Sequence, residues 1–170
     1  MSAIMNSVGT FYEPIKLSGN AIGGILPAQI GLLSMLTELN LSQNSIEGSL
    51  PLETEFGGGL AALTRLRSLS CRENILTGPL TGARLPPSLV FLRLSNNRFS
   101  GPVPRIITRM AGLRVLRLDH NFLSGDVTRL PPEVEIVDLY VTQTKACNSS
   151  TGRGAVLTGL LCVSSVFMAW

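Results

Sequence analysis

Residues 36–48 read LTELNLSQNSIEG, and this stretch decides the fold because its spacing recurs along the chain. It follows the pattern L-x-x-L-x-L-x-x-N-x-L-x-G, of which the chain holds about six copies between residues 12 and 142. Five copies keep the asparagine, and the successive asparagines are 24, 30, 23 and 24 residues apart: Asn20, Asn44, Asn74, Asn97 and Asn121. The longest step contains a glycine-rich insertion around residues 53–59. Such a period indicates coils that stack on one another.

Each copy predicts one short strand. Alternation along L-x-L sends both leucines inward and the residue between them outward, and parallel copies would stack about 4.8 Å apart. The asparagine amide can donate to and accept from backbone groups in the turn that follows, so we expect a structural ladder of the five asparagines. The pattern predicts an α/β-type repeat solenoid with a parallel sheet of short strands on the concave side and irregular or 3-10 segments on the convex side.

The copies resemble the leucine-rich repeats of plant receptor ectodomains, because the motif continues as N-x-L-x-G-x-[ILV]-P at Leu26-Pro27, Leu50-Pro51 and Val103-Pro104. This resemblance covers about residues 12–142 and implies a leucine-rich repeat solenoid. A weaker resemblance links the Leu-Pro-Pro triplets at 85–87 and 130–132, together with the C-terminal tail, to lipid-anchored leucine-rich surface antigens of kinetoplastid parasites.

The composition argues against an enzyme. The 170 residues contain one histidine, His120, and three cysteines, Cys71, Cys147 and Cys162, without metal-ligand spacing. His120 follows Asp119, but no nucleophile motif accompanies the pair. We therefore predict no catalytic residue, no cofactor and no metal. Nucleic-acid binding is also not expected, because only 5% of the residues are aromatic and a stacking platform needs several.

Basic residues gather in the middle of the chain. Residues 65–130 carry eleven Arg and three acidic residues, whereas the whole chain has a net charge of +3. The outward strand positions and their neighbours form a candidate partner-binding face: Arg67, Arg72, Phe91, Arg93, Arg114 and Arg117. Arginine suits paired hydrogen bonds to carboxylates and phosphates, so the expected partner is an acidic protein segment, an anionic glycan or a phosphate. The alternative is that solvent screens these charges and they only keep the solenoid soluble.

The two ends differ from the repeats. Residues 1–11 form an N-terminal flank without a secretory signal pattern, residues 143–154 a polar linker, and residues 155–170 an uncharged apolar tail. Three interpretations of the tail stay open: a glycosylphosphatidylinositol (GPI) anchor signal with its attachment site among Asn148, Ser149 and Ser150, a membrane-associated helix, or a capping helix. Asn40 and Asn148 begin glycosylation triplets, which matter only on the secretory route.

Two function classes follow. The first is a non-enzymatic binding module at the membrane or cell surface, which recognises a protein or glycan partner through its concave face. The second is a cytoplasmic scaffold whose C-terminal segment is a capping or interaction helix.

Overall fold

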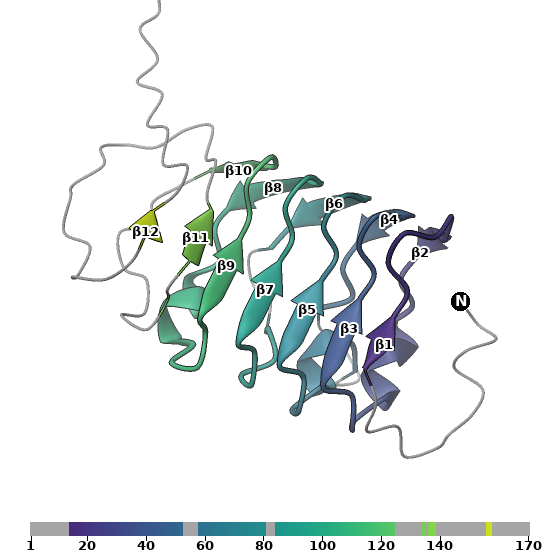
Figure 1. Cartoon of the computed structure of the whole chain (residues 1–170), viewed down its shortest axis with the longest axis horizontal. Helices are drawn as coiled ribbons and strands as arrows, with labels where there is room; N and C mark the ends of the chain where they lie inside the picture. The colour runs from purple at the N-terminus through teal and green to yellow at the C-terminus, as the bar shows by residue number, and fades with distance from the viewer. Residues whose placement is uncertain are drawn as a thin grey trace, which may run out of the picture.

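A computed structural model describes residues 14–52, 58–80, 84–124, 134, 136–138 and 156–157. Over this part the chain winds in successive coils, and each coil adds one strand to a parallel sheet, which we call the main sheet (Figure 1). Its strands lie side by side in chain order: β1 (Ile15–Lys16), β3 (Glu38–Asn40), β5 (Ser68–Ser70), β7 (Phe91–Arg93), β9 (Val115–Arg117), β11 (Ile136–Asp138) and β12 (Val156–Leu157). The predicted repeat solenoid is confirmed.

A second parallel sheet, which the repeat pattern does not predict, follows the asparagine of each coil. It contains β2 (Gly23–Ile25), β4 (Ser45–Ser49), β6 (Ile75–Pro79), β8 (Arg98–Pro102) and β10 (Phe122–Ser124), with each strand beside that of the next coil. The x-L-x-G residues continue as strands because Ile46, Leu76, Phe99 and Leu123 turn inward and the flanking residues turn outward.

In the described part of the chain, three short 3-10 helices lie on the side of the coils opposite the main sheet, which we call the helix side. They agree with the expectation. They are η2 (Ala28–Leu32), η3 (Leu60–Ala62) and η4 (Arg105–Arg109). Pro27 and Pro104 directly precede η2 and η4 with φ values of −75° and −67°, as proline requires. Within the described residues, no helix has the length and apolar character needed to cross a membrane.

The core is a single column of aliphatic side chains between the two sheets and the helices. Leu39, Leu69, Leu92 and Leu116 occupy the same position on neighbouring strands and are almost completely buried. Cys71 stands at an inward leucine position of its coil and is also fully buried, and this burial raises the pKa of its thiol to about 12. Cys71 is therefore a neutral core residue rather than a reactive thiol.

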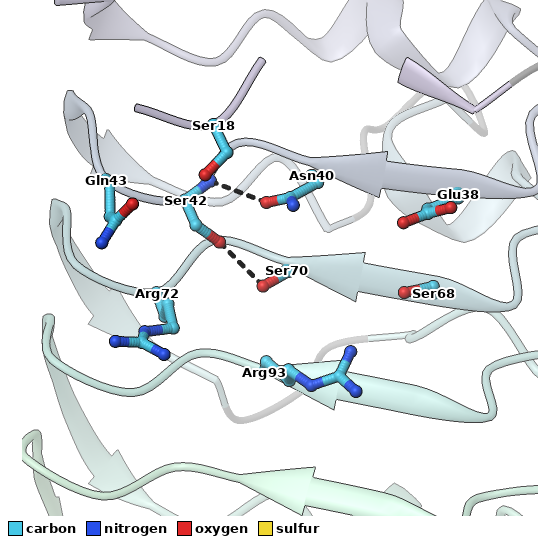
Figure 2. Close-up of a pocket in the computed structure, with 9 residues that line it drawn as sticks. All are labelled: Ser18, Glu38, Asn40, Ser42, Gln43, Ser68, Ser70, Arg72 and Arg93. Carbon is cyan, nitrogen blue, oxygen red and sulfur yellow. Dashed lines mark hydrogen bonds between the residues drawn. The ribbon is translucent and has the colours of Figure 1, made fainter. Parts of the chain in front are cut away.

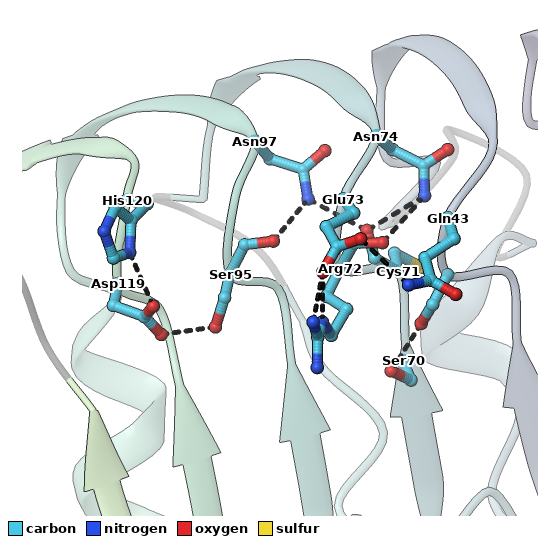
Figure 3. A network of polar contacts seen from close by, with 11 residues as sticks. Gln43, Ser70, Cys71, Arg72, Glu73, Asn74, Ser95, Asn97, Asp119 and His120 are labelled. Atoms are coloured by element: carbon cyan, nitrogen blue, oxygen red, sulfur yellow. Dashed lines mark hydrogen bonds and ion pairs between the residues drawn. The ribbon is translucent and has the colours of Figure 1, made fainter.

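Asparagine side chains connect each coil to the one before it. The Oδ1 atom of Asn97 accepts a hydrogen bond from the backbone N–H of Leu76 at 3.0 Å. Its Nδ2 atom donates to the carbonyl of Cys71 at 2.8 Å, as Figure 3 shows. Asn44, Asn74 and Asn121 make the equivalent pair of bonds to their own preceding coils. Asn20 is exposed and donates only to carbonyls of its own coil, Leu17 and Ser18.

The residue before each ladder asparagine has a left-handed backbone, a feature that the sequence pattern does not reveal. Gln43, Glu73, Asn96 and His120 have φ values between 53° and 56°, and Gly19 holds this place in the first described coil with φ 72°. Only glycine adopts this conformation without steric cost, and asparagine tolerates it better than most other residues. The tight turn after each main-sheet strand therefore holds mild backbone strain in four coils.

This row of turns gives a direct prediction. Asn96→Val should lower the free energy of unfolding by about 1–2 kcal/mol, because a branched side chain crowds the backbone at positive φ. Asn96→Gly should change the free energy of unfolding by less than about 1 kcal/mol. Glycine relieves the strain in the folded state, but it also raises the conformational entropy of the unfolded chain. Urea unfolding of both variants would check this, and equal effects would contradict it.

Several predicted features lie outside the described residues. These are the N-terminal flank at residues 1–11, the polar linker at 143–154, and Asn148, Ser149 and Ser150 as glycosylation or anchor sites. Of the apolar tail, only Val156–Leu157 is described, as strand β12, which pairs in parallel with β11. None of the three interpretations of the tail includes a strand at this place.

Candidate functional site

The exposed face of the main sheet carries most of the predicted partner-binding residues. The residues between the paired leucines lie in one row, because Lys16, Asn40, Ser70, Arg93 and Arg117 are register partners on β1, β3, β5, β7 and β9. The row begins with Lys16, continues through two uncharged polar residues to two neighbouring arginines, and its next register position, on β11, is Asp138 beside Arg117. Arg93 and Arg117 are immediate neighbours, about 4.8 Å apart along the sheet.

A hollow of about 280 Å³ lies on this face beside the arginines (Figure 2). Small polar side chains form most of its lining, with one carboxylate and two guanidinium groups: Ser18, Glu38, Asn40, Ser42, Gln43, Ser68, Ser70, Arg72 and Arg93. The hydroxyl oxygens of Ser42 and Ser70 are 2.8 Å apart, and the Oδ1 atom of Asn40 accepts the backbone N–H of Ser42 at 3.1 Å. These bonds hold the middle of the hollow in one arrangement.

Arg93 is held against an aromatic ring. Its guanidinium carbon lies 5.1 Å from the centre of the Phe91 ring, a cation–π distance. Partial burial lowers the pKa of Arg93, the positive charge of Arg117 lowers it further, and Glu38 opposes the shift. Arginine nevertheless stays charged, so this position is a fixed cation with a second cation beside it.

Arg72 is engaged with its neighbour rather than with Arg93. Its guanidinium pairs with Glu73, whose carboxylate also accepts a hydrogen bond from the Nε2 atom of Gln43 at 3.0 Å (Figure 3). The hydrogen bond from Arg72, and then that from Gln43, lowers the pKa of Glu73. Glu73 therefore neutralises much of the charge that Arg72 would bring to the hollow.

Arg67 and Arg114 lie apart from the other predicted residues. Both side chains are exposed, and each residue lies just before a main-sheet strand. Val90, from the coil between them, separates the two arginines. The Val90 N–H donates to the Arg67 carbonyl, and the Val90 carbonyl accepts from the Arg114 N–H. The two arginines therefore stand two coils apart, roughly 10 Å, at the edge where the strands begin. The structure divides the predicted cluster into a central pair (Arg93 and Arg117 with Phe91), a paired residue (Arg72) and an edge pair (Arg67 and Arg114).

Ser95, Asp119 and His120 form a polar chain at the opposite edge. The Ser95 hydroxyl donates to the Asp119 carboxylate, which also lies 2.8 Å from the Nδ1 atom of His120 (Figure 3). Burial acts to raise the pKa of Asp119, but the bonds from Ser95 and His120 outweigh it and hold the pKa below its usual value. The serine proton points at a carboxylate rather than at the imidazole, so these three residues lack the order of a nucleophile and its base.

No cluster of histidine, cysteine, aspartate or glutamate in the described part of the chain could hold a metal ion. The groups that line the hollow on the main-sheet face are hydroxyls, amides, one carboxylate and two guanidinium groups, which suit recognition of polar and anionic groups. The predicted site did not include the serines that line the hollow. In the sequence, nothing distinguishes these serines from other solvent-facing polar residues.

The coils, the two parallel sheets and the asparagine bonds define the class as a repeat solenoid. The family model described as Leucine Rich Repeat matches residues 35–55 and 88–110. Receptor-like protein 7 of Arabidopsis thaliana is 35% identical over 123 residues, which cover 70% of this chain and 12% of that protein. The chain is therefore a leucine-rich repeat protein with repeats of the plant type.

Solved structures of receptors show the same fold. The plant peptide hormone receptor RGFR1 in complex with RGF2 matches with a TM-score of 0.62 and 25% identity, over 76% of this chain and 24% of the receptor. The ectodomain of the Arabidopsis receptor kinase HAESA, in complex with an IDA peptide hormone ligand, matches with a TM-score of 0.61 and 26% identity over 74% and 21%. The chain spans only 8–14% of the length of the first curated relatives that it matches.

Proposed function

We propose that this chain is a non-enzymatic binding module whose main-sheet face binds an acidic segment of a protein or peptide. One observation carries the proposal: Arg93 and Arg117 are register partners beside a polar hollow. Two cations on neighbouring strands repel each other, and an anionic group placed between them removes that repulsion. Burial is the main cause of the lowered pKa of Arg93, and repulsion by Arg117 lowers it further.

The remaining features of the face fit a peptide rather than a compact ion. The hollow extends from Arg93 across β5 and β3 to Ser18, past hydroxyl and amide groups that can pair with a peptide backbone. Phe91 fixes the Arg93 side chain, so less conformational entropy is lost when a ligand binds. The RGFR1 and HAESA structures hold peptide hormones, which supports a peptide partner and an extracellular position for this chain.

The test is a charge reversal with a matched control. Arg93→Glu combined with Arg117→Glu should weaken binding of a fluorescent octapeptide of alternating Glu and Gly about tenfold or more, measured by anisotropy at low salt. The control, Arg65→Glu combined with Arg98→Glu, changes the net charge equally at two exposed positions away from the hollow. Equal weakening in both variants, or unchanged binding in the first, would reject the proposed face.

A further inference from the structure

The outer face of the second sheet, which points away from the core, carries exposed apolar side chains. Ile25 on β2, Ile75 on β6 and Phe122 on β10 are 67%, 37% and 63% exposed. Among the described residues, only one other large apolar side chain is exposed, Leu32 on the helix side. Single exposed apolar residues are common, but a group of them among polar residues on one face is typical of an interaction surface.

Two opposite charges stand on this outer face, on the strands between those that carry the apolar residues. Glu47 lies on β4 and Arg98 on β8, and both side chains are exposed. They are the only charged residues on the five described strands of the second sheet. Within the described part of the chain, neither of them forms an ion pair. Both are therefore available to charges on another molecule.

The order of these side chains across the sheet is self-complementary. The strands lie in the order β2, β4, β6, β8 and β10, as Figure 1 shows. One outward residue from each strand gives the sequence apolar, acidic, apolar, basic, apolar: Ile25, Glu47, Ile75, Arg98 and Phe122. In the reverse order, the apolar positions stay the same and the two charges exchange signs. This face is therefore complementary to a reversed copy of itself.

The strand register places the centre of this pattern on β6. Glu47 is the register partner of Ile75, and Arg98 is the partner of Thr77, two residues further along β6. Strands about 4.8 Å apart with a rise of about 3.3 Å per residue place the Cα atoms of Glu47 and Arg98 roughly 12 Å apart, with their midpoint on β6. A two-fold axis that passes through this midpoint in the plane of the face, perpendicular to the line between the two residues, exchanges the two charged positions.

The same axis brings the apolar positions together. Ile25 is a second register partner of Glu47. Phe122 is the partner of Ser100, two residues beyond the arginine of β8. On a flat lattice with the same spacings, the axis carries Ile25 to within about 4 Å of the Phe122 position, and Ile75 to within about 4 Å of itself. Apolar positions therefore meet apolar positions, and each charge meets its opposite.

We propose that the outer face of the second sheet binds a second copy of this chain in a two-fold symmetric dimer. Glu47 of each copy pairs with the partner's Arg98, so the ion pair forms twice. Ile25 packs beside the partner's Phe122, and the two Ile75 side chains meet near the axis, which removes apolar surface from water. The main sheet lies on a different side of the coils, so the polar hollow stays open in both copies.

The dimer is expected to be weak. Five strands about 4.8 Å apart, each about 16 Å long, give a face of roughly 300 Å², well below the 800 Å² or so per partner that is about the standard for stable interfaces. Exposed ion pairs add only a little to the affinity. We therefore expect half of the chains to be dimeric at a concentration of roughly 0.1–1 mM, as in a transient interface.

The test is sedimentation velocity of the full chain from about 10 µM to about 1 mM, with variants that change the charges. Glu47→Arg leaves two basic residues on the face and Arg98→Glu leaves two acidic ones, so each variant alone should self-associate at least about tenfold more weakly. An equimolar mixture of the two variants should associate to within about threefold of the unsubstituted chain, because a basic face then meets an acidic face. Circular dichroism would check that both variants are folded.

Arg109→Glu is the matched control. It makes the same charge change as Arg98→Glu at an exposed position on the helix side, and it should leave self-association unchanged. A second measurement locates the contact: in NMR spectra of the isotope-labelled chain, dilution should shift the amide resonances of Ile25, Ile75 and Phe122.

Three results would overturn the proposal. The first is a monomer throughout the concentration range. The second is self-association that persists in both single variants, which would place the contact elsewhere in the chain, for example in the apolar tail. The third is a mixture that associates no better than its components, which would show that the two charges do not face each other across a two-fold axis.

Discussion

Replacing Asn97 by alanine should lower the free energy of unfolding by about 2–5 kcal/mol. The Asn97 side chain accepts the N–H of Leu76 and donates to the carbonyls of Cys71 and Leu94, at distances of 3.0, 2.8 and 3.1 Å. Alanine removes the side-chain partner of the buried Leu76 N–H, which costs about 1–3 kcal/mol, and it removes two further bonds worth about 0.5–1.5 kcal/mol each. The Cys71 and Leu94 carbonyls still accept hydrogen bonds from Asn74 and Asn121. Because whole domains are stable by only about 5–15 kcal/mol, urea unfolding followed by circular dichroism should detect the change readily.

Asn20→Ala is the matched control for this prediction. Asn20 has the same place in its coil, but it is exposed and bonds only to the Leu17 and Ser18 carbonyls. Its removal should cost less than about 1 kcal/mol, because water can replace both bonds. Similar losses for Asn20→Ala and Asn97→Ala would show that the asparagines act within their turns and do not tie consecutive coils together.

The main sheet follows from the repeat because one physical pattern specifies it. The inward leucines fix the face of each strand, and the constant period places every strand beside the equivalent one. Within a single copy, the segment of the second sheet has one inward residue, such as Ile46, whereas the L-x-L segment of the main sheet has two. Its pairing between coils, for example Glu47 with Ile75, comes into being only when neighbouring coils are stacked. Periodicity in one copy therefore predicts the main sheet and misses the second.

The strand positions of the site residues could be predicted from the sequence, but the contacts between their side chains could not. Strand alternation places Arg93 and Arg117 outward, and the repeat period places them side by side. The pairing of Arg72 with Glu73 depends on how two adjacent side chains turn, which the strand pattern does not specify.

Gly59→Ala should cost about 3 kcal/mol or more of the free energy of unfolding. Gly59 has φ 77° and ψ −166°, a region that essentially only glycine occupies, and placing another residue there costs about 1–3 kcal/mol. A Cβ atom at this position would also lie 2.3 Å from the carbonyl oxygen of Pro51, so the backbone must move, at a further cost of about 1–3 kcal/mol. Thermal and urea unfolding of the variant would measure the loss.

Substitutions of two other glycines separate the conformational cost of Gly59→Ala from its steric cost. Gly24 has φ 81°, and an added methyl group would meet no atom within 4 Å, so Gly24→Ala should show the conformational cost alone, about 1–2 kcal/mol. Gly112 requires no positive φ, and the nearest atom to its added Cβ is 3.8 Å away, so Gly112→Ala should change stability by less than about 1 kcal/mol. If Gly59→Ala costs no more than Gly24→Ala, the close packing of the Gly59 backbone on Pro51 does not constrain the path of the chain within this coil.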